Sequence, residues 1–355
     1  MIASRDYSLT GPEGRRAQEQ GLAGATWYAS PIPRKQMKEL MRRTDGPAIR
    51  DTLIWFAVLG ALATLLYQTW GTWWAVPVFL VYSIFYGSCG DSRWHECGHG
   101  TAFRTPWMNK AIYYLASFLV LRNGTLWRWS HTRHHTDTIV VGRDPEIAVM
   151  RPPSFERIFA NLFYLQDGRV QLGRIARFTL GIMNEEEKDF VPESERWKAF
   201  LEARIQAAVL VGVVVWCIVI GSVMPAFLIG LPTFFGTWMD VILFGFTQHA
   251  GLAEDVVDHR LNCRTVHMNP VFRFIYWNMN YHLEHHMFPM VPYHALPRLH
   301  DAMKDDTPPA YDGVIAAWKE ILPALWRQRR DPTYFVERQL PPTARPFAEL
   351  SRAAA

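Results

Sequence analysis

Residues 51–90 read DTLIWFAVLGALATLLYQTWGTWWAVPVFLVYSIFYGSCG, a stretch without Lys or Arg in which Asp51 is the only charged side chain. Residues 207–248 form a second stretch of this kind, with Asp240 as its only charged side chain. Each stretch is about 40 residues long, and a helix needs about 20 residues to cross a hydrocarbon core of about 30 Å. Each stretch therefore predicts two membrane-spanning helices joined by a short turn.

Turn signals near the middle of each stretch set the limits of the predicted helices. Residues 68–74 (QTWGTWW) contain one Gly and three Trp, and Trp favours the membrane interface. Residues 222–232 contain two Pro and one Gly, which interrupt helices. A pair of buried helices in a soluble protein is the alternative, but such helices rarely leave two stretches of this length without Lys or Arg. The predicted spans are therefore about 51–69, 73–90, 206–224 and 227–247.

Lys and Arg are concentrated in the three remaining segments. Residues 1–50 contain nine, residues 93–204 contain sixteen and residues 260–355 contain twelve. Two hairpins place all three segments on one side of the membrane, and the positive-inside rule makes that side the cytoplasm. The first 50 residues lack the apolar core of a secretory signal. We therefore expect an integral protein of a bacterial inner membrane, with both termini and the active site in the cytoplasm.

This pattern predicts three parts of the chain. Residues 1–50 form a cytosolic N-terminal segment, in which residues 33–45 (PRKQMKELMRRTD) predict a basic amphipathic helix suited to a membrane surface. Residues 51–300 form the membrane domain, and residues 301–355 form a cytosolic helix, expected at 312–330, and a Pro-rich tail. The net charge of +4 is too small for a dedicated nucleic-acid-binding protein. Four Cys without a Cys-x-x-Cys pair exclude a disulfide framework and a zinc ribbon.

Nine of the 13 His lie in four places near the predicted cytosolic ends of the spans. Three places are the short motifs HECGH, HTRHH and HLEHH, and the fourth is a single His at the end of the last predicted span. The nine are His95, His99, His131, His134, His135, His249, His282, His285 and His286. Positions i, i+3 and i+4 share one face of a helix, so each motif points its imidazoles in one direction. Metal binding accounts for this pattern better than coincidence does.

The number of His indicates more than one metal ion. A structural zinc takes four ligands and a catalytic zinc takes three ligands and a water, so nine imidazoles exceed one such site. They would fill two sites of four or five ligands and leave positions open for dioxygen. Imidazole binds Fe, Cu, Zn and Ni, and composition alone does not choose iron among them.

Two other functions fit parts of the pattern. HECGH matches His-Glu-x-x-His, in which Glu96 would be the general base of an intramembrane zinc metalloprotease. That site needs only one further ligand and leaves most of the other His unexplained. A metal transporter would hold its ions near the bilayer midplane, whereas the predicted spans contain no His before His249.

The residues around the three motifs resemble those of a known family. WHECGHGTAF (94–103), WRWSHTRHHTDT (127–138) and NYHLEHHMFPMVPYH (280–294) are similar to the three His boxes of the membrane fatty acid desaturase/hydroxylase superfamily. The second predicted hairpin lies between the second and third boxes, and the resemblance covers about residues 50–300. Together with the hydrophobic pattern, it implies an all-α integral membrane protein with four transmembrane helices in two hairpins. A cytosolic helical cap would hold a His-rich di-metal site.

The resemblance also implies a cofactor and its ligands. The centre would be a non-haem site with two Fe ions, which uses O2 and two electrons to remove hydrogen from an unactivated C–H bond. The eight box His would be both ligands and catalytic residues, and His249 would correspond to a ninth ligand that stearoyl-type members carry after the fourth span. Those members place an Asn four residues earlier to hold a metal-bound water. Gly245 stands at that position here, and Gln248 is a candidate substitute.

Each ligand His also needs an acceptor for its second ring nitrogen. Acidic residues close to the motifs in the sequence are the candidates. They are Asp91, Glu96, Asp137, Asp144, Asp255, Asp258 and Glu284. Cys97 lies inside the first motif, and we assign it no role.

For the reaction, the resemblance implies O2-dependent desaturation or hydroxylation, most often of a fatty acyl chain. The alternative is hydroxylation or oxidative demethylation of a small metabolite, an alkane or a carotenoid. The sequence contains no His-Pro-Gly-Gly haem motif and no Cys pattern for an iron–sulfur cluster. We therefore expect electrons from a separate ferredoxin or Rieske-type protein and its reductase, docked on the basic cytosolic face. Membrane lipid is the other expected partner, and no nucleic acid is expected.

Overall fold

The computed structural model describes residues 5–347, and the regular elements in this range are helices, so the predicted all-α class is confirmed. The longer helices are α3 (Gly46–Thr69), α4 (Ala75–Gly87), α6 (Pro106–Leu119), α7 (Gly124–Thr136), α9 (Leu165–Thr179), α11 (Glu193–Ile220) and α19 (Val314–Gln328). The shorter α-helices are α1 (Pro12–Glu19), α2 (Arg34–Leu40), α5 (Arg93–His99), α8 (Phe155–Asn161), α10 (Glu185–Phe190), α12 (Met224–Leu228), α13 (Leu231–Gly236), α14 (Phe246–His249), α15 (His259–Asn262), α16 (Pro270–Ile275), α17 (His282–Met287) and α18 (Leu296–Met303). A π-helical segment η1 (Asp240–Gly245) and two 3-10 turns, η2 (Tyr293–Ala295) and η3 (Lys304–Asp306), complete the set.

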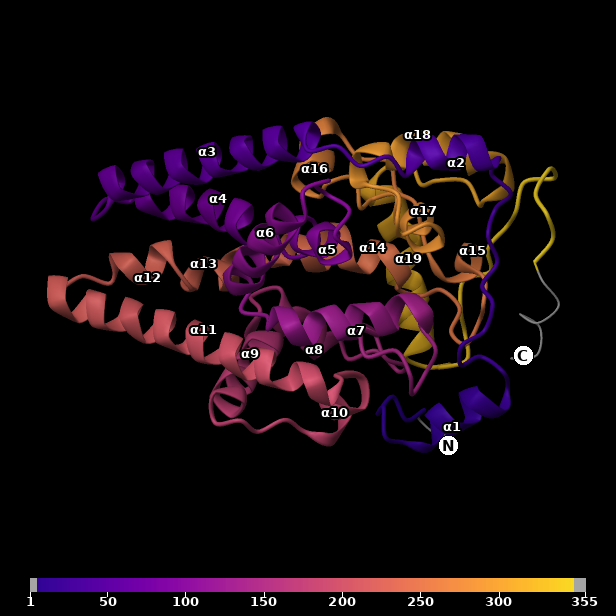
Figure 1. Ribbon diagram of the computed structural model, residues 1–355, viewed down its shortest axis with the longest axis horizontal. Coiled ribbons are helices and arrows are strands. Elements are labelled where there is room, and N and C mark those ends of the chain that lie inside the picture. The colour runs from indigo at the N-terminus through magenta and orange to yellow at the C-terminus, as the bar shows by residue number, and fades with distance from the viewer. Residues whose placement is uncertain (1–4, 348–355) are drawn as a thin grey trace.

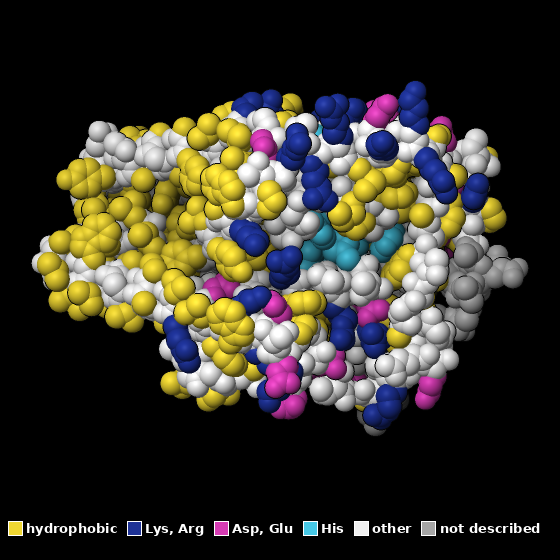
Figure 2. Space-filling view, in the orientation of Figure 1, with side chains coloured by type: hydrophobic (Ala, Val, Ile, Leu, Met, Phe, Trp, Pro, Cys, Tyr) yellow, Lys and Arg dark blue, Asp and Glu magenta, His cyan; other side chains and the backbone are white. Residues whose placement is uncertain are grey.

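Helices α3 and α11 extend along one apolar end of the molecule (Figure 1). They have 24 and 28 residues and are long and apolar enough to cross a membrane. Only 22% and 17% of the residues in their apolar windows are buried, so most of these side chains face outward; Leu53 is 62% exposed and Val219 is 77% exposed. Figure 2 shows hydrophobic side chains over the same end of the molecule. Core helices of a soluble protein would bury these side chains, so the exposure indicates association with a membrane.

Two of the four predicted spans have a different form in the structure. Helix α4 has 13 residues, and at 1.5 Å per residue it covers about 20 Å, less than a hydrocarbon core. The span predicted at 227–247 is divided into α12, α13, η1 and α14. Pro225 and Pro232 stand in the first turns of α12 and α13, and Gly230 has a φ of 96°, so the backbone does not continue as one helix. The topology of four complete spans in two hairpins therefore stays a prediction.

Helices α4 and α13 approach each other closely through two glycines. A Cβ atom on Gly236 would lie on the carbonyl oxygen of Ser83, and one on Gly87 would lie 2.9 Å from the carbonyl carbon of Gly236. Small residues permit such backbone contact between apolar helices.

Replacing Gly236 by Ala is therefore expected to separate α13 from α4. Overpacking of this kind costs about 1–3 kcal/mol, so the melting temperature of the detergent-purified protein should fall. Gly212 is the matched control, because a Cβ atom there meets nothing within 4 Å. If Gly236→Ala and Gly212→Ala melted at the same temperature as the unmodified protein, the close contact would not matter for stability.

Helices α1, α2, α15, α18 and α19 lie toward the other, more polar end of the molecule, and we call this part the cap (Figure 1). Helix α2 covers part of the helix predicted at 33–45. It lies beside α18 within this cap and buries Leu40. Helix α19 forms within the helical segment predicted at 312–330.

Side-chain hydrogen bonds attach the N-terminal segment to this cap and to α7. The hydroxyl groups of Tyr28 and Ser30 donate hydrogen bonds to the carboxylate of Asp306, at 2.7 and 2.6 Å. The indole Nε1 of Trp27 donates to the carbonyl oxygen of Thr136, at the end of α7, at 2.9 Å. These bonds join the start of the described chain to elements more than a hundred residues away in the sequence.

Candidate metal centre

Four helices between the apolar end and the cap carry the nine predicted His: α5, α7, α14 and α17 (Figure 1). Helix α5 ends at Gly100, whose φ of 69° lies in the left-handed region that favours glycine. Helix α7 begins where the Asn123 side chain accepts the amide of Leu126 at 3.0 Å and the Glu202 carboxylate accepts the amide of Thr125 at 2.9 Å. These caps give hydrogen-bond partners to backbone groups that would otherwise be unpaired at the helix ends. They also fix the residues at which the His-bearing helices begin and end.

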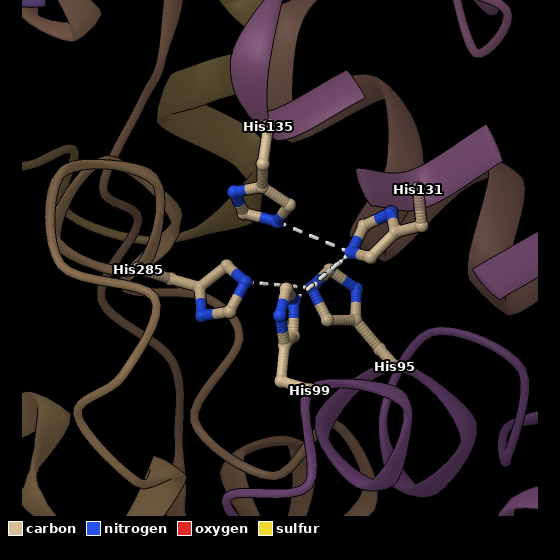
Figure 3. Close-up of side chains that lie close together, drawn as sticks. All are labelled: His95, His99, His131, His135 and His285. Carbon is tan, nitrogen blue, oxygen red and sulfur yellow. Dashed lines mark hydrogen bonds between the residues drawn. The ribbon is translucent and has the colours of Figure 1, made fainter. Parts of the chain in front are cut away.

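Five of the His form a first group, in which one ring nitrogen of each lies within 4.8 Å of the others. Figure 3 shows these imidazoles pointing toward one another. The Nε2 atom of His95 lies 2.7 Å from Nε2 of His285, and Nε2 of His131 lies 3.1 Å from Nε2 of both His95 and His99. The group consists of His95, His99, His131, His135 and His285.

The other four His form a second group with the same spacing of ring nitrogens. Its members are His134, His249, His282 and His286. The Nε2 atoms of His249 and His282 are 3.0 Å apart. The rings of His135 and His286 stack with centroids 4.3 Å apart, so the two groups are neighbours. The second and third boxes each supply members to both groups, and all nine predicted His belong to one group or the other.

The donor set fits divalent transition-metal ions. Burial lowers the pKa of His249 to about 3 and lowers the pKa values of His131 and His285 well below their usual value, so these imidazoles stay neutral and keep a lone pair. Lone pairs that face each other at about 3 Å repel unless a proton or a cation lies between them. Four buried ring nitrogens of the centre have no hydrogen-bond partner, which is rare in a protein interior. They are Nδ1 of His135, His282 and His285 and Nε2 of His286.

Three carboxylates orient His rings of the two groups by contacting their Nδ1 atoms. Asp91 contacts Nδ1 of His95 at 3.0 Å, Glu146 contacts Nδ1 of His131 at 2.9 Å, and Asp144 contacts Nδ1 of His134 at 2.8 Å. Each carboxylate accepts a hydrogen bond from Nδ1, an arrangement that would leave Nε2 to bind a metal. The carbonyl oxygen of Asn262 contacts Nδ1 of His249 in the same way at 2.7 Å. The hydroxyl oxygen of Thr138 contacts Nδ1 of His286 at 3.2 Å.

Sequence reasoning found Asp91 and Asp144 but missed Glu146, Thr138 and Asn262. Glu146 lies two residues after Asp144 in the same short acidic segment, and this closeness was the available signal. The hydrogen bond from His249 goes to the backbone carbonyl of Asn262, so the side-chain types in the sequence could not have indicated it.

The other acidic candidates stabilise the cap and contact no ligand His. Asp137 pairs with Arg143, Asp255 with Arg5, Asp258 with Arg260, and Glu284 with His300. Glu96 accepts the backbone amide of Tyr293 at 2.9 Å, and burial raises its pKa to about 7. Its engagement with the backbone after the third box argues against a role as a peptidase base.

Gln248 acts through a carboxylate and contacts no ligand His. Its amide nitrogen donates to Asp91 and to the hydroxyl of Tyr276, both at 2.5 Å. Gln248 therefore helps to fix the carboxylate that orients His95. Gly245, at the end of η1, provides no side chain toward the second group.

The first group opens to the surface through a cavity of about 160 Å³. Four of its His line this cavity together with Trp94, Tyr113, Arg128, Thr132, Thr136 and Pro289. Figure 2 shows His side chains visible at the molecular surface, with Lys and Arg side chains nearby. The cavity gives a small molecule access to the ring nitrogens.

Comparison with known proteins agrees with this geometry. A family model described as fatty acid desaturase matches residues 69–318. The chain belongs to the fatty acid desaturase family. Membership of this family favours the desaturase/hydroxylase interpretation over the zinc metalloprotease.

Three relatives of this desaturase-family protein are plant proteins of low identity. An omega-3 fatty acid desaturase, chloroplastic, from Sesamum indicum is 25% identical in a match that covers 74% of this chain and 61% of that protein. An acyl-lipid omega-3 desaturase (cytochrome b5), endoplasmic reticulum, from Arabidopsis thaliana is 22% identical over 76% of this chain and 70% of its own length. A probable fatty acid desaturase from Sorghum bicolor is 23% identical over 80% of this chain and 71% of its own. The match to the sesame protein thus spans less than two thirds of that protein's length.

Proposed function

We propose that the protein is an O2-dependent non-haem di-iron desaturase of a fatty acyl chain. The observation that carries the proposal is the convergence of nine His from three boxes and α14 into adjacent groups of five and four. Iron bound at both groups would supply the reductive activation of O2 that removal of hydrogen from an unactivated C–H bond requires. Family membership and the acyl-lipid substrates named for the relatives support the choice of substrate.

In this proposal, the chain's own residues hold and orient the centre. Asp91, Glu146 and Asp144 fix the rotation of three ligand rings, so the donors stand ready before a metal binds. Trp94 and Tyr113 form an apolar wall of the cavity beside the first group. The apolar helices α3 and α11 keep this cavity near a membrane, where acyl chains are abundant.

We also propose the partners and the location. Electrons would come from a separate ferredoxin or Rieske-type carrier, because the sequence contains no haem or iron–sulfur motif of its own. Arg128 is exposed at the mouth of the cavity, where a cation favours an acidic carrier. The excess of Lys and Arg outside the apolar stretches supports a cap on the cytoplasmic side of a membrane, and we propose a bacterial inner membrane as that membrane.

A second candidate is hydroxylation or oxidative demethylation of a smaller molecule at the same centre. The open cavity favours it, because Arg128, Thr132 and Thr136 give one side of the cavity a polar lining suited to a polar substrate. Hydroxylation and desaturation share the first hydrogen removal, so one ligand set serves both.

Metal and product analysis together test the proposal. The purified protein is expected to contain two iron ions per chain. Cells that express it should accumulate lipids with one additional double bond, detected by mass spectrometry. A product heavier by one oxygen atom, or lacking a methyl group, would favour the second candidate. Protein that binds no iron under aerobic and anaerobic reconstitution would contradict both.

A further inference from the structure

Helix α9 exposes a stripe of apolar side chains, although the sequence predicts the segment that contains it to be cytosolic. Leu165 is 58% exposed, Leu172 is 42% exposed, and Leu180, at the C-terminal end of the helix, is 74% exposed. Leu172 and Leu180 follow Leu165 by seven and fifteen residues, a spacing that keeps all three near one face of an α-helix. Phe178 is buried on another face, where its ring packs on Phe200 of α11. Core packing therefore accounts for one face of α9 and leaves the apolar stripe on the surface.

The C-terminal end of α9 is attached to α11 where the apolar part of α11 begins. The Nε atom of Arg204 donates a hydrogen bond to the carbonyl oxygen of Thr179 at 3.1 Å. Arg204 is the last Lys or Arg before the second apolar stretch. The 16 residues that follow Arg204 in α11 end at Ile220 and cover about 24 Å, which is most of a hydrocarbon core of about 30 Å. Leu180 therefore lies near the level at which α11 would enter the hydrocarbon core.

The N-terminal end of α9 contacts the apolar end of the molecule through α13. The ring centroids of Tyr164 and Phe234 are 5.9 Å apart. A Cβ atom on Gly168 would lie 2.7 Å from a ring carbon of Phe234. Phe234 belongs to α13, within the second apolar stretch. Both ends of α9 thus touch helices of that stretch, and Figure 1 shows α9 beside the part of α11 that is farther from the apolar end.

The exposed apolar surface of α11 continues past this border. Trp197, Leu201 and Ile205 stand four residues apart and are 59%, 47% and 57% exposed. Positions i and i+4 share one face of a helix, and Trp favours the membrane interface. The stripe of α9 therefore lies beside a helix whose own exposed apolar surface extends from its membrane-associated part to about two turns beyond Arg204.

Basic side chains at this place favour a lipid bilayer over a second copy of the chain as the partner. Arg169 is exposed within the stripe, and Arg204 is exposed at the border. Arg buries its aliphatic stem in apolar surroundings and keeps its guanidinium group in the polar layer, where anionic headgroups attract it. Between two protein copies, the same cations would need carboxylates opposite them. Figure 2 shows hydrophobic side chains beside Lys and Arg side chains over this part of the surface.

We propose that α9 lies on the membrane surface, with Leu165, Leu172 and Leu180 in the outer part of the hydrocarbon layer and Arg169 at the phospholipid headgroups. The partner is a bilayer that contains anionic lipid. Glu202 of α11 caps the start of α7, so the contact also holds that His-bearing helix at a fixed depth. The proposal does not depend on the metal or on the reaction.

Nitroxide labels on the full-length protein test the proposal in nanodiscs of phosphatidylcholine and phosphatidylglycerol that hold one chain each. Cys217→Ser removes the half-buried Cys, and the other free Cys are buried. Leu172→Cys or Leu180→Cys is then labelled, and its collision rates with O2 and with a water-soluble nickel chelate give its depth. Both labels are expected to lie about 5–10 Å inside the bilayer surface. Ile315→Cys on α19 is the matched control, because this apolar side chain is 75% exposed in the cap and its label should lie in water.

Two results would overturn the proposal. The first is access of the nickel chelate to both α9 labels that equals its access to the label at residue 315. The second is protection from nickel that appears only in discs with two chains, which would assign the stripe to a second copy. If a labelled variant has lost helix content by circular dichroism, Leu165→Cys is judged by the same measurements. The labels report depth without iron or turnover, so a failure of the proposed function would leave their result unchanged.

Discussion

Protein with Ala in place of His285 is expected to lack the ion of the first group and to form no product. The Nε2 atom of His285 lies 2.7 Å from Nε2 of His95, closer than any other pair of ring nitrogens in that group. Its removal takes one of five donors and leaves a cavity in a fully buried position. His134→Ala should have the same consequence for the second group. That group has only four His, three from the boxes and one from α14.

Iron per chain and product formation are measured for both variants beside His267→Ala. The surface variant should keep two ions and full turnover, because His267 is half exposed. Full turnover of either site variant with one iron, or of unmodified protein with zinc alone, would contradict the di-metal proposal. The variants differ in which group they remove, so loss of both ions from either one would show that the two groups bind metal together.

Replacing Glu146 by Ala is expected to weaken metal binding by about 10–100-fold. Glu146 accepts hydrogen bonds from Nδ1 of His131 at 2.9 Å and from the hydroxyl of Ser130 at 2.6 Å. Without it, the His131 ring rotates more freely and its Nδ1 proton has no partner in the interior. Glu146→Gln keeps an acceptor oxygen without the charge, so its affinity should lie between those of the Ala variant and the unmodified protein.

Metal affinity is measured by competition with a chelator at fixed pH. Glu156→Ala, on the exposed side of α8, is the control and should bind metal normally. If Glu146→Ala kept the affinity of the control, the carboxylate would serve only the packing of the loop after α7.

The ligands could be predicted from the sequence because their spacing is local. His131, His134 and His135 lie within one helical turn, and the 3.6-residue period alone places their side chains close together. Which of the two groups each of these His would join could not be predicted from the sequence. His131 and His135 reach the first group and His134 the second, and this division depends on how α7 is rotated against α5 and α17.

The supporting residues were less predictable because closeness in sequence is a poor guide to closeness in space. Asp255 and Asp258 follow His249 within ten residues, yet they pair with Arg5 and Arg260. Glu146 is 15 residues from His131 and contacts it.

The apolar stretches show the same limit. The absence of Lys and Arg correctly indicated helices with exposed apolar side chains, as in α3 and α11. It could not show where a helix is interrupted. Gly230 and Pro232 were interpreted as part of one turn between two continuous spans. In the structure, the second of those spans is divided into several short helices up to His249.

The first group joins residues that are 190 positions apart in the chain, from His95 to His285. During synthesis, the first two boxes therefore emerge long before the third, and only four of the five first-group donors and one of the four second-group donors precede residue 200. Neither group is complete until α17 has left the ribosome. A metal ion that needs all the donors of either group would therefore be bound only late in synthesis, once α17 has emerged, and not while the first two boxes alone are exposed.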